Sequence, residues 1–132
     1  MGLTILEALK LSIAAHQEGN LQKAEEGYRS VLKMDPTHPD ANHNLGVIAL
    51  FVGRPDSALP FFESALASSS KVEQFWVSYI EALIADNQFN SALENIEKCG
   101  KLGIYSKQLK ALENQCANSM LARDSNQKLS LI

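Results

Sequence analysis

The most constraining feature of the sequence is a set of residue types that recurs every 34 residues. One column of this repeat holds Ala24, Ala58 and Ala92, and another holds the larger residues Tyr28, Phe62 and Ile96. A third column holds Gly19, Gly53 and Asn87, which all tolerate the left-handed backbone that ends a helix. A period of this length is typical of a stacked supersecondary unit that cannot bury its apolar face alone.

Each unit shows the pattern of two helices. In the first unit an apolar stripe that includes Leu11 stops before Gly19, and a second stripe starts at Ala24 and stops at Asp35-Pro36. The residue before a proline is pushed out of the helical region, so the second helix ends there. The sequence therefore predicts an all-α solenoid of helical hairpins. The three hairpins span about 5–38, 39–72 and 73–106.

The residues after the third unit predict one further helix, over about 105–122. Its apolar residues fall within about 80° of a helical wheel, which suits a helix that closes the stack. They are Tyr105, Leu109, Leu112, Cys116 and Met120. Residues 1–122 are thus expected to form a single domain, and the polar tail 123–132 is expected to fray.

These residues carry a family resemblance. The second unit resembles the tetratricopeptide repeat (TPR) in the run Asn42, Leu45, Gly46, Ala49, Ala58, Phe62 and Ala65. The resemblance covers residues 5–106, although Ser12 and Ile80 occupy the column of Gly46. The run 74–83 also resembles the N-terminal repeat regions of bacterial glycosyltransferases, sulfotransferases and methyltransferases.

The resemblance implies that the first helix of each hairpin lines a concave groove for a partner. The residues that it assigns to this groove are Leu9, Ile13, His16 and Gln17; His43, Asn44, Val47, Leu50 and Phe51; and Val77, Ser78, Glu81, Ile84 and Ala85. Some family members clamp a peptide carboxylate with Lys, Arg and Asn. Asn44 fits that pattern, but Leu9, Ile13, Gln74 and Ser78 replace the other members. A groove that binds by packing is therefore expected.

Composition and charge limit the classes of partner that the chain is expected to bind. The formal net charge is −3 and Lys and Arg do not cluster, which argues against nucleic acid and against a membrane surface. No apolar run reaches the roughly 18–20 residues of a membrane span, and the N-terminus lacks the pattern of a signal peptide. Two cysteines are too few for a disulfide framework. We expect a cytoplasmic protein.

No set of residues predicts catalysis, a cofactor or a metal. His38, Asp40 and His43 are the one cluster of potential ligands, but their spacing does not suit a helix-borne site and zinc needs four well-placed ligands. Cys99 falls in the column of Val31 and Ala65, so it is expected to be a core residue. The chain is therefore expected not to be an enzyme.

Three functions remain open. The leading hypothesis is a scaffold that binds a peptide or a partner domain in the groove. The alternative is a non-catalytic targeting or oligomerisation arm of a larger transferase. The third is a homo-oligomer formed through the apolar first helix, whose apolar residues are too many for one hairpin to bury. These residues are Leu3, Ile5, Leu6, Leu9, Leu11 and Ile13.

Overall fold

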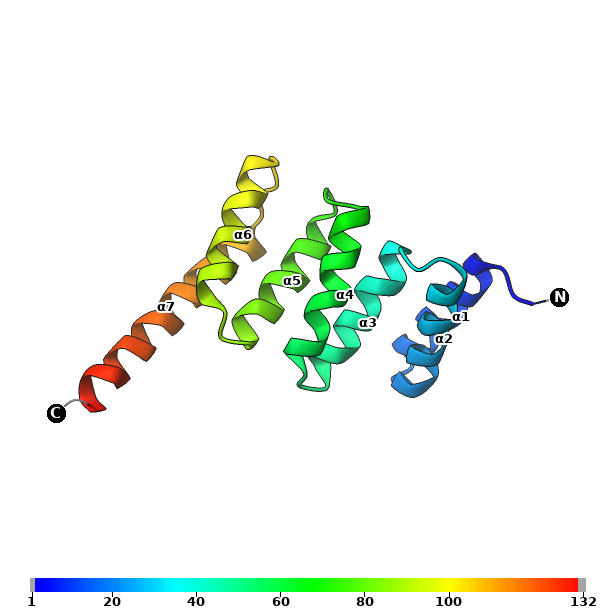
Figure 1. Cartoon of the computed structure of the whole chain (residues 1–132), viewed down its shortest axis with the longest axis horizontal. Helices are drawn as coiled ribbons and strands as arrows, with labels where there is room; N and C mark the ends of the chain where they lie inside the picture. The colour runs from blue at the N-terminus through cyan, green and yellow to red at the C-terminus, as the bar shows by residue number, and fades with distance from the viewer. Residues whose placement is uncertain (1, 131–132) are drawn as a thin grey trace.

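The computed structural model describes residues 2–130, and this part of the chain is built of helices alone. Each helix packs mainly on the one before it and the one after it. The helices are α1 (Ile5–Gln17), α2 (Leu21–Met34), α3 (Pro39–Phe51), α4 (Pro55–Ser68), α5 (Glu73–Ala85), α6 (Phe89–Lys101) and α7 (Lys107–Ser130). They form three antiparallel hairpins side by side along the long axis, with the termini at opposite ends (Figure 1). The predicted all-α solenoid is confirmed.

The turn inside each hairpin uses the left-handed backbone that the repeat predicts. Gly19 has a φ of 81°, Gly53 a φ of 82° and Asn87 a φ of 61°. In each turn the residue that follows donates its backbone N–H to a carbonyl five residues back, as Asn20 does to Ala15 at 2.9 Å. The turn therefore satisfies carbonyls that the helix end would otherwise leave unpaired.

Small residues allow the two helices of a hairpin to approach closely. Ala24, Ala58 and Ala92 are fully buried at these crossings. In the second hairpin Gly46 also lies against the ring of Phe62, where an added Cβ would clash with three ring atoms.

The two helices of the first hairpin also approach closely, but here the glycine is on the second helix. Ser12 stands in the column of Gly46, and the small partner is Gly27 on α2, where a Cβ would clash with the Ser12 hydroxyl. That hydroxyl donates to the carbonyl of Ala8 at 2.7 Å, so it is paired within its own helix. The glycine at the close contact therefore lies on the second helix in the first hairpin and on the first helix in the second hairpin.

Large residues fill the space between hairpins. Tyr28 and Phe62 are fully buried, and the indole of Trp76 donates to the carbonyl of Ser70 at 2.7 Å. Ile96, their counterpart in the third hairpin, is only half-buried, because α7 alone follows it. Pro60 lies inside α4 without ending that helix.

The closing helix differs from its predicted bounds. It starts at Lys107 and continues to Ser130, because residues 123–130 contain neither glycine nor proline to stop it. The hydroxyl of Ser106 accepts the backbone N–H of Leu109 at 3.1 Å and so caps its first turn. The expected buried stripe holds at Leu109, Leu112 and Cys116. The fraying predicted for 131–132 lies outside the described residues.

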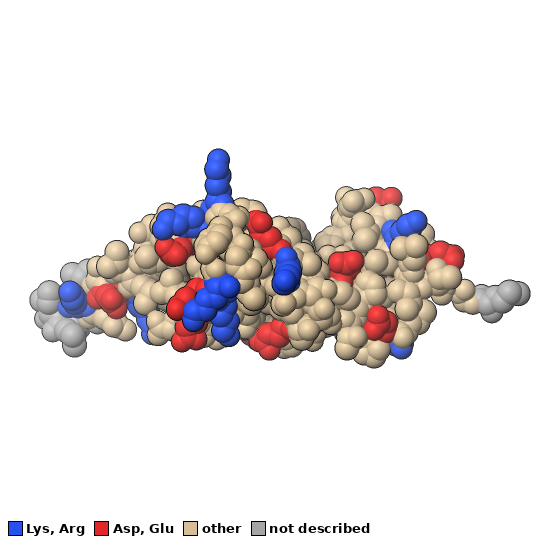
Figure 2. All heavy atoms as spheres, turned by 90° about the horizontal axis from the view of Figure 1, so that it is seen from above, with Lys and Arg blue, Asp and Glu red and all other residues tan. Residues whose placement is uncertain are grey.

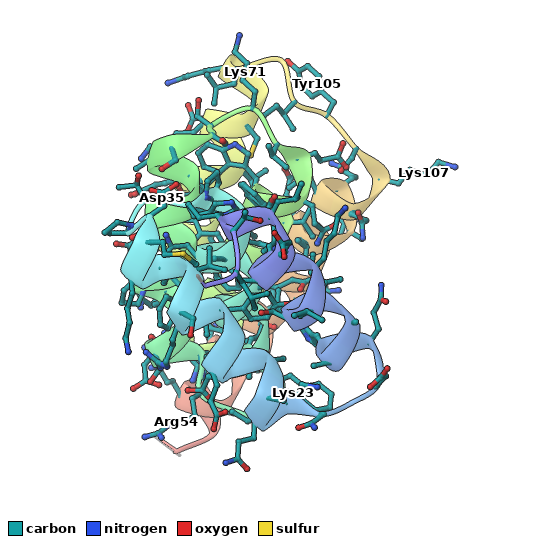
Figure 3. All side chains as sticks on the ribbon, turned by 90° about the vertical axis from the view of Figure 1, so that its right-hand side faces the viewer. Lys23, Asp35, Arg54, Lys71, Tyr105 and Lys107 are labelled. Atoms are coloured by element: carbon teal, nitrogen blue, oxygen red, sulfur yellow. The ribbon has the colours of Figure 1, made fainter. Side chains whose placement is uncertain are left out.

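Tyr105 was wrongly placed on that stripe. It precedes the helix, and its side chain is 78% exposed. Figure 3 shows Tyr105 and Lys107 at the outer edge of the molecule. The phenol hydroxyl donates to the carbonyl of Gly100 at 2.9 Å, which fixes the connection between α6 and α7.

Candidate functional site

The two faces of α3 show which side of the molecule is open. Leu45 and Ile48 are buried and, with Val52, line a recess bounded by residues of α2 and α4. The opposite face carries Val47, which is half-buried, and Phe51, whose side chain is 78% exposed. In a helix residues four apart lie on one side, so these two form a single apolar strip. We call the surface that contains it the inner face.

The 34-residue register extends the inner face along the whole stack. Two columns run along it, one containing Ile13, Val47, Glu81 and Gln115, and the other containing Gln17, Phe51, Ala85 and Ser119. The last member of each column lies on α7, which the sequence analysis treated only as a cap. Continuing the repeat for another 34 residues would have revealed both members.

A cavity of about 1050 Å³ lies at the C-terminal end of the inner face, between α5 and α7. Its α5 wall is formed by Glu81, Ile84 and Ala85, and its α7 wall includes Gln115, Ser119 and Arg123. Phe89 and Leu112, which are buried, contribute its apolar floor. The long C-terminal half of α7 therefore builds one side of this cavity. Of the predicted groove residues, Glu81, Ile84 and Ala85 line it.

Five of the predicted groove residues have little exposed surface. Val77 is fully buried, Ser78 is 3% and Ile84 7% exposed, and Leu9 and His43 are each 8% exposed. Leu9, His43 and Val77 share one repeat column, and the ring of His43 packs on α5 of the next hairpin. A pattern read from one hairpin does not predict this burial, because it depends on how the next hairpin packs against it.

His43 links the second and third hairpins. Its ring stacks on Phe75 with centroids 4.7 Å apart, and its Nε2 atom lies 2.8 Å from the Oγ atom of Ser78. The Gln74 amide donates to the same Oγ at 3.2 Å. The Ser78 hydroxyl is therefore placed to donate to Nε2, which leaves the proton of neutral His43 on Nδ1, facing the Asn44 Oδ1 atom at 3.2 Å. Burial lowers the pKa of His43, which favours this neutral form.

A second histidine makes a similar contact in the first hairpin. His16 is half-buried, and its Nδ1 atom lies 3.1 Å from the hydroxyl of Tyr28. Burial raises the pKa of Tyr28, and a hydrogen bond from Asn44 partly offsets that rise. Asn44 thus interacts with Tyr28 on one side and with His43 on the other. Through Asn44, His43 and Ser78, polar contacts therefore link the three hairpins to one another.

The remaining reactive residue types have structural roles. His38 accepts the backbone N–H of Ala41 at 3.2 Å and so caps α3, while His43 points toward α5. Within residues 2–130, no three potential ligands converge on a point where a metal ion could sit. Both thiols are buried, which raises the pKa of Cys116 and raises that of Cys99 to about 11.

The surface charges are mixed. Figure 2 shows Lys and Arg side chains interspersed with Asp and Glu over the face that it presents. The ion pairs, such as Arg29 with Glu25 at 3.1 Å, are exposed pairs within one helix. In the described chain no helix is both long enough and apolar enough to cross a bilayer.

The outer side of α1 exposes apolar side chains, as the sequence predicts. Leu3 is 51%, Leu6 59% and Leu11 53% exposed. Leu45, which occupies the same repeat column as Leu11, is only 3% exposed because α2 precedes it in the stack. Leu11 therefore lies where a preceding helix would pack.

Comparison with known proteins supports the repeat fold. No family model matches the chain. The type IV pilus assembly protein PilF of Pseudomonas aeruginosa is 24% identical over 106 residues, which are 80% of this chain and 42% of that protein. The chain thus spans less than half of this curated relative.

Solved TPR domains superimpose closely. The first TPR of Spaghetti (RPAP3), bound to the HSP90 peptide SRMEEVD, has a TM-score of 0.80 at 14% identity, covering 89% of this chain and 93% of that one. The TPR2B domain of yeast Sti1, in a complex with pHsp70, has a TM-score of 0.78 at 16% identity, covering 87% and 97%. The chain therefore has the TPR fold. These proteins give no support to the resemblance to transferase-linked repeats.

Proposed function

We propose that the chain is a non-catalytic scaffold that binds a polypeptide segment along its inner face. The observation that carries this proposal is the exposure of Phe51, 78%, beside half-buried Val47 and Leu50. A large aromatic side chain left in water costs hydrophobic free energy, which a partner recovers when it covers the ring. Two TPR domains of the same fold are described with a peptide bound, or in a complex with pHsp70.

The chemistry of the inner face favours binding by packing. Its central residues in the first two hairpins are Ile13, Val47 and Phe51, and none carries a charge. Ser78, at a clamp position of the family, is buried against His43 and is not available to a carboxylate. We therefore expect apolar side chains of the partner to supply most of the contact over α1 and α3.

Charge insertion tests the proposal. A phage-displayed library of random 15-residue peptides would be selected on the wild type, on Val47→Asp and on Phe51→Asp. Both variants should lose peptide capture while circular dichroism and melting stay near wild type. Val52→Asp is the matched control, because Val52 is 55% exposed, directly follows the last residue of α3 and lines the recess beside α2 and α4 instead of the inner face. Equal capture by Phe51→Asp and wild type would remove the proposal.

The exposed face of α1 favours a second, separate contact. Leu6 and Leu11 of α1 are more than half exposed, and so is Leu3 just before this helix. A second copy of the chain that covered them would form a homo-oligomer without occupying the inner face. Its test is the concentration dependence of the molecular mass, given in the Discussion.

A further inference from the structure

The inner face changes character along its length. In one repeat column Ile13 and Val47 are followed by Glu81 and then by Gln115. The first two hairpins thus present an apolar surface, and the cavity between α5 and α7 presents a carboxylate and then amide and hydroxyl groups. A bound segment would meet apolar side chains at one end and Glu81 beyond them.

Glu81 presents an exposed carboxylate to the α5–α7 cavity. None of the described residues gives this carboxylate an ion pair or a hydrogen bond, whereas Glu25 and Glu113 are both paired with cations. The partial desolvation at the cavity wall raises the pKa of Glu81. A Lys or Arg brought into the cavity by a partner would form a charge-assisted hydrogen bond with this carboxylate.

Arg123 lines the same cavity from α7. Among the described residues, however, it forms no ion pair with Glu81. Glu81 lies on α5, which is packed between α4 and α6, so its position is fixed by the stack.

We propose that the segment bound on the inner face carries a Lys or Arg that pairs with Glu81 in the α5–α7 cavity, next to apolar residues that pack on Val47 and Phe51. The inference rests on the proposed function, because it assigns the partner chemistry of the same surface. It also states how the bound segment lies on the inner face, because its basic residue must lie at the α5 end. Segments with an acidic residue at that position are disfavoured by like-charge repulsion.

The experiment selects the same phage-displayed library of random 15-residue peptides on wild type, Glu81→Gln, Glu81→Arg and Glu94→Gln. Glu94 is an exposed carboxylate on α6 that does not line the α5–α7 cavity, and its change to Gln alters the net charge by the same amount as Glu81→Gln. Wild type and Glu94→Gln should enrich apolar peptides with one Lys or Arg. Glu81→Gln should lose the basic preference, and Glu81→Arg should replace it with Asp or Glu.

A selected peptide then gives the affinity test. Replacing its basic residue by Gln should weaken binding roughly fivefold to twentyfold on wild type and less than about twofold on Glu81→Gln. Equal weakening on both proteins, or no basic enrichment among captured peptides, would overturn this inference while leaving groove binding intact. Absence of capture by every protein, or undiminished capture by Phe51→Asp, would instead overturn the proposed function.

Discussion

The Nε2 atom of His43 and the Oγ atom of Ser78 lie 2.8 Å apart, although 35 residues separate the two side chains in the sequence. Both residues are buried, so the bond is shielded from water and ties α3 directly to α5. Most contacts of a solenoid join helices that follow one another in the chain. This bond instead joins the first helix of the second hairpin to the first helix of the third.

Ser78→Ala should lower the free energy of unfolding by about 1–3 kcal/mol. The change leaves the His43 Nε2 atom buried without its partner, which is the costly way to remove a hydrogen bond. Urea denaturation followed by circular dichroism measures the difference. Ser64→Ala is the control, because Ser64 is exposed on α4, and it should change the stability by less than about 0.5 kcal/mol. Equal stability of Ser78→Ala and wild type would argue that the bond is weak.

The stability should fall as the pH drops from 7 toward 5. Burial lowers the pKa of His43 below its ordinary value of 6.5, and the Asn44 hydrogen bond and the Asp40 charge offset this only in part. The unfolded chain thus takes up a proton that the folded chain refuses, so stability declines below pH 6.5 and levels off below the folded pKa. Each unit of pKa difference contributes about 1.4 kcal/mol.

His43→Gln tests whether His43 is the group responsible. Its urea-derived stability should depend on pH less steeply than that of the wild type between pH 5 and pH 7, although its stability at pH 7 is lower. Parallel pH profiles for the two proteins would show that His43 is not the group responsible.

Gly46→Ala should destabilise the second hairpin by about 1–3 kcal/mol, because the new Cβ clashes with the ring of Phe62. The double variant Gly46→Ala with Phe62→Leu provides the check. If the clash is the cause, the two changes together should cost less than the sum of the single changes. Thermal melting of the four proteins gives this coupling, and strict additivity would point to another origin.

Both cysteines should resist thiol reagents in the folded protein. Cys99 and Cys116 are buried, and burial raises the pKa of both thiols, so little thiolate is present at pH 8. The Cys116 thiol also donates to the carbonyl of Phe89 at 3.4 Å. A disulfide reagent that changes absorbance should react with neither thiol in buffer and with both in denaturant. Rapid labelling of one thiol in buffer would locate a local opening.

The α1 face should cause self-association if a second copy covers it. Light scattering would then show a mass that rises with concentration for the wild type, and Leu6→Ser with Leu11→Ser should abolish that rise. The two changes should cost little stability because both side chains are more than half exposed. A constant monomer mass across the concentration range would exclude homo-oligomerisation through this helix.

The repeat predicted the hairpins well because their limits depend on local backbone chemistry. Gly19, Gly53 and Asn87 end the first helices, and Pro39 and Pro55 begin the next ones, all through preferences of single residues. The predicted end of α7 was wrong because such a local signal is missing there. A polar segment without glycine or proline has nothing in its sequence that stops a helix.

The binding residues were harder to predict because their exposure is set by neighbouring hairpins. The register correctly grouped His43 with Val77, but whether that column faces solvent depends on the twist between α3 and α5. Ile13, Val47 and Glu81, four positions further along their helices, remain partly or largely exposed. The sequence thus predicts the columns of the proposed site, whereas the packing of successive hairpins decides which column is exposed.

The anchoring of α7 has a mechanical consequence. Leu109, Leu112 and Cys116 hold its first half against the stack, whereas the helix continues to Ser130. At 1.5 Å per residue the part beyond Cys116 is a lever of about 20 Å. A tilt of about 10° at the anchored half therefore moves its far end by about 4 Å. Such a tilt would change the width of the α5–α7 cavity, because residues of α7 form one of its walls.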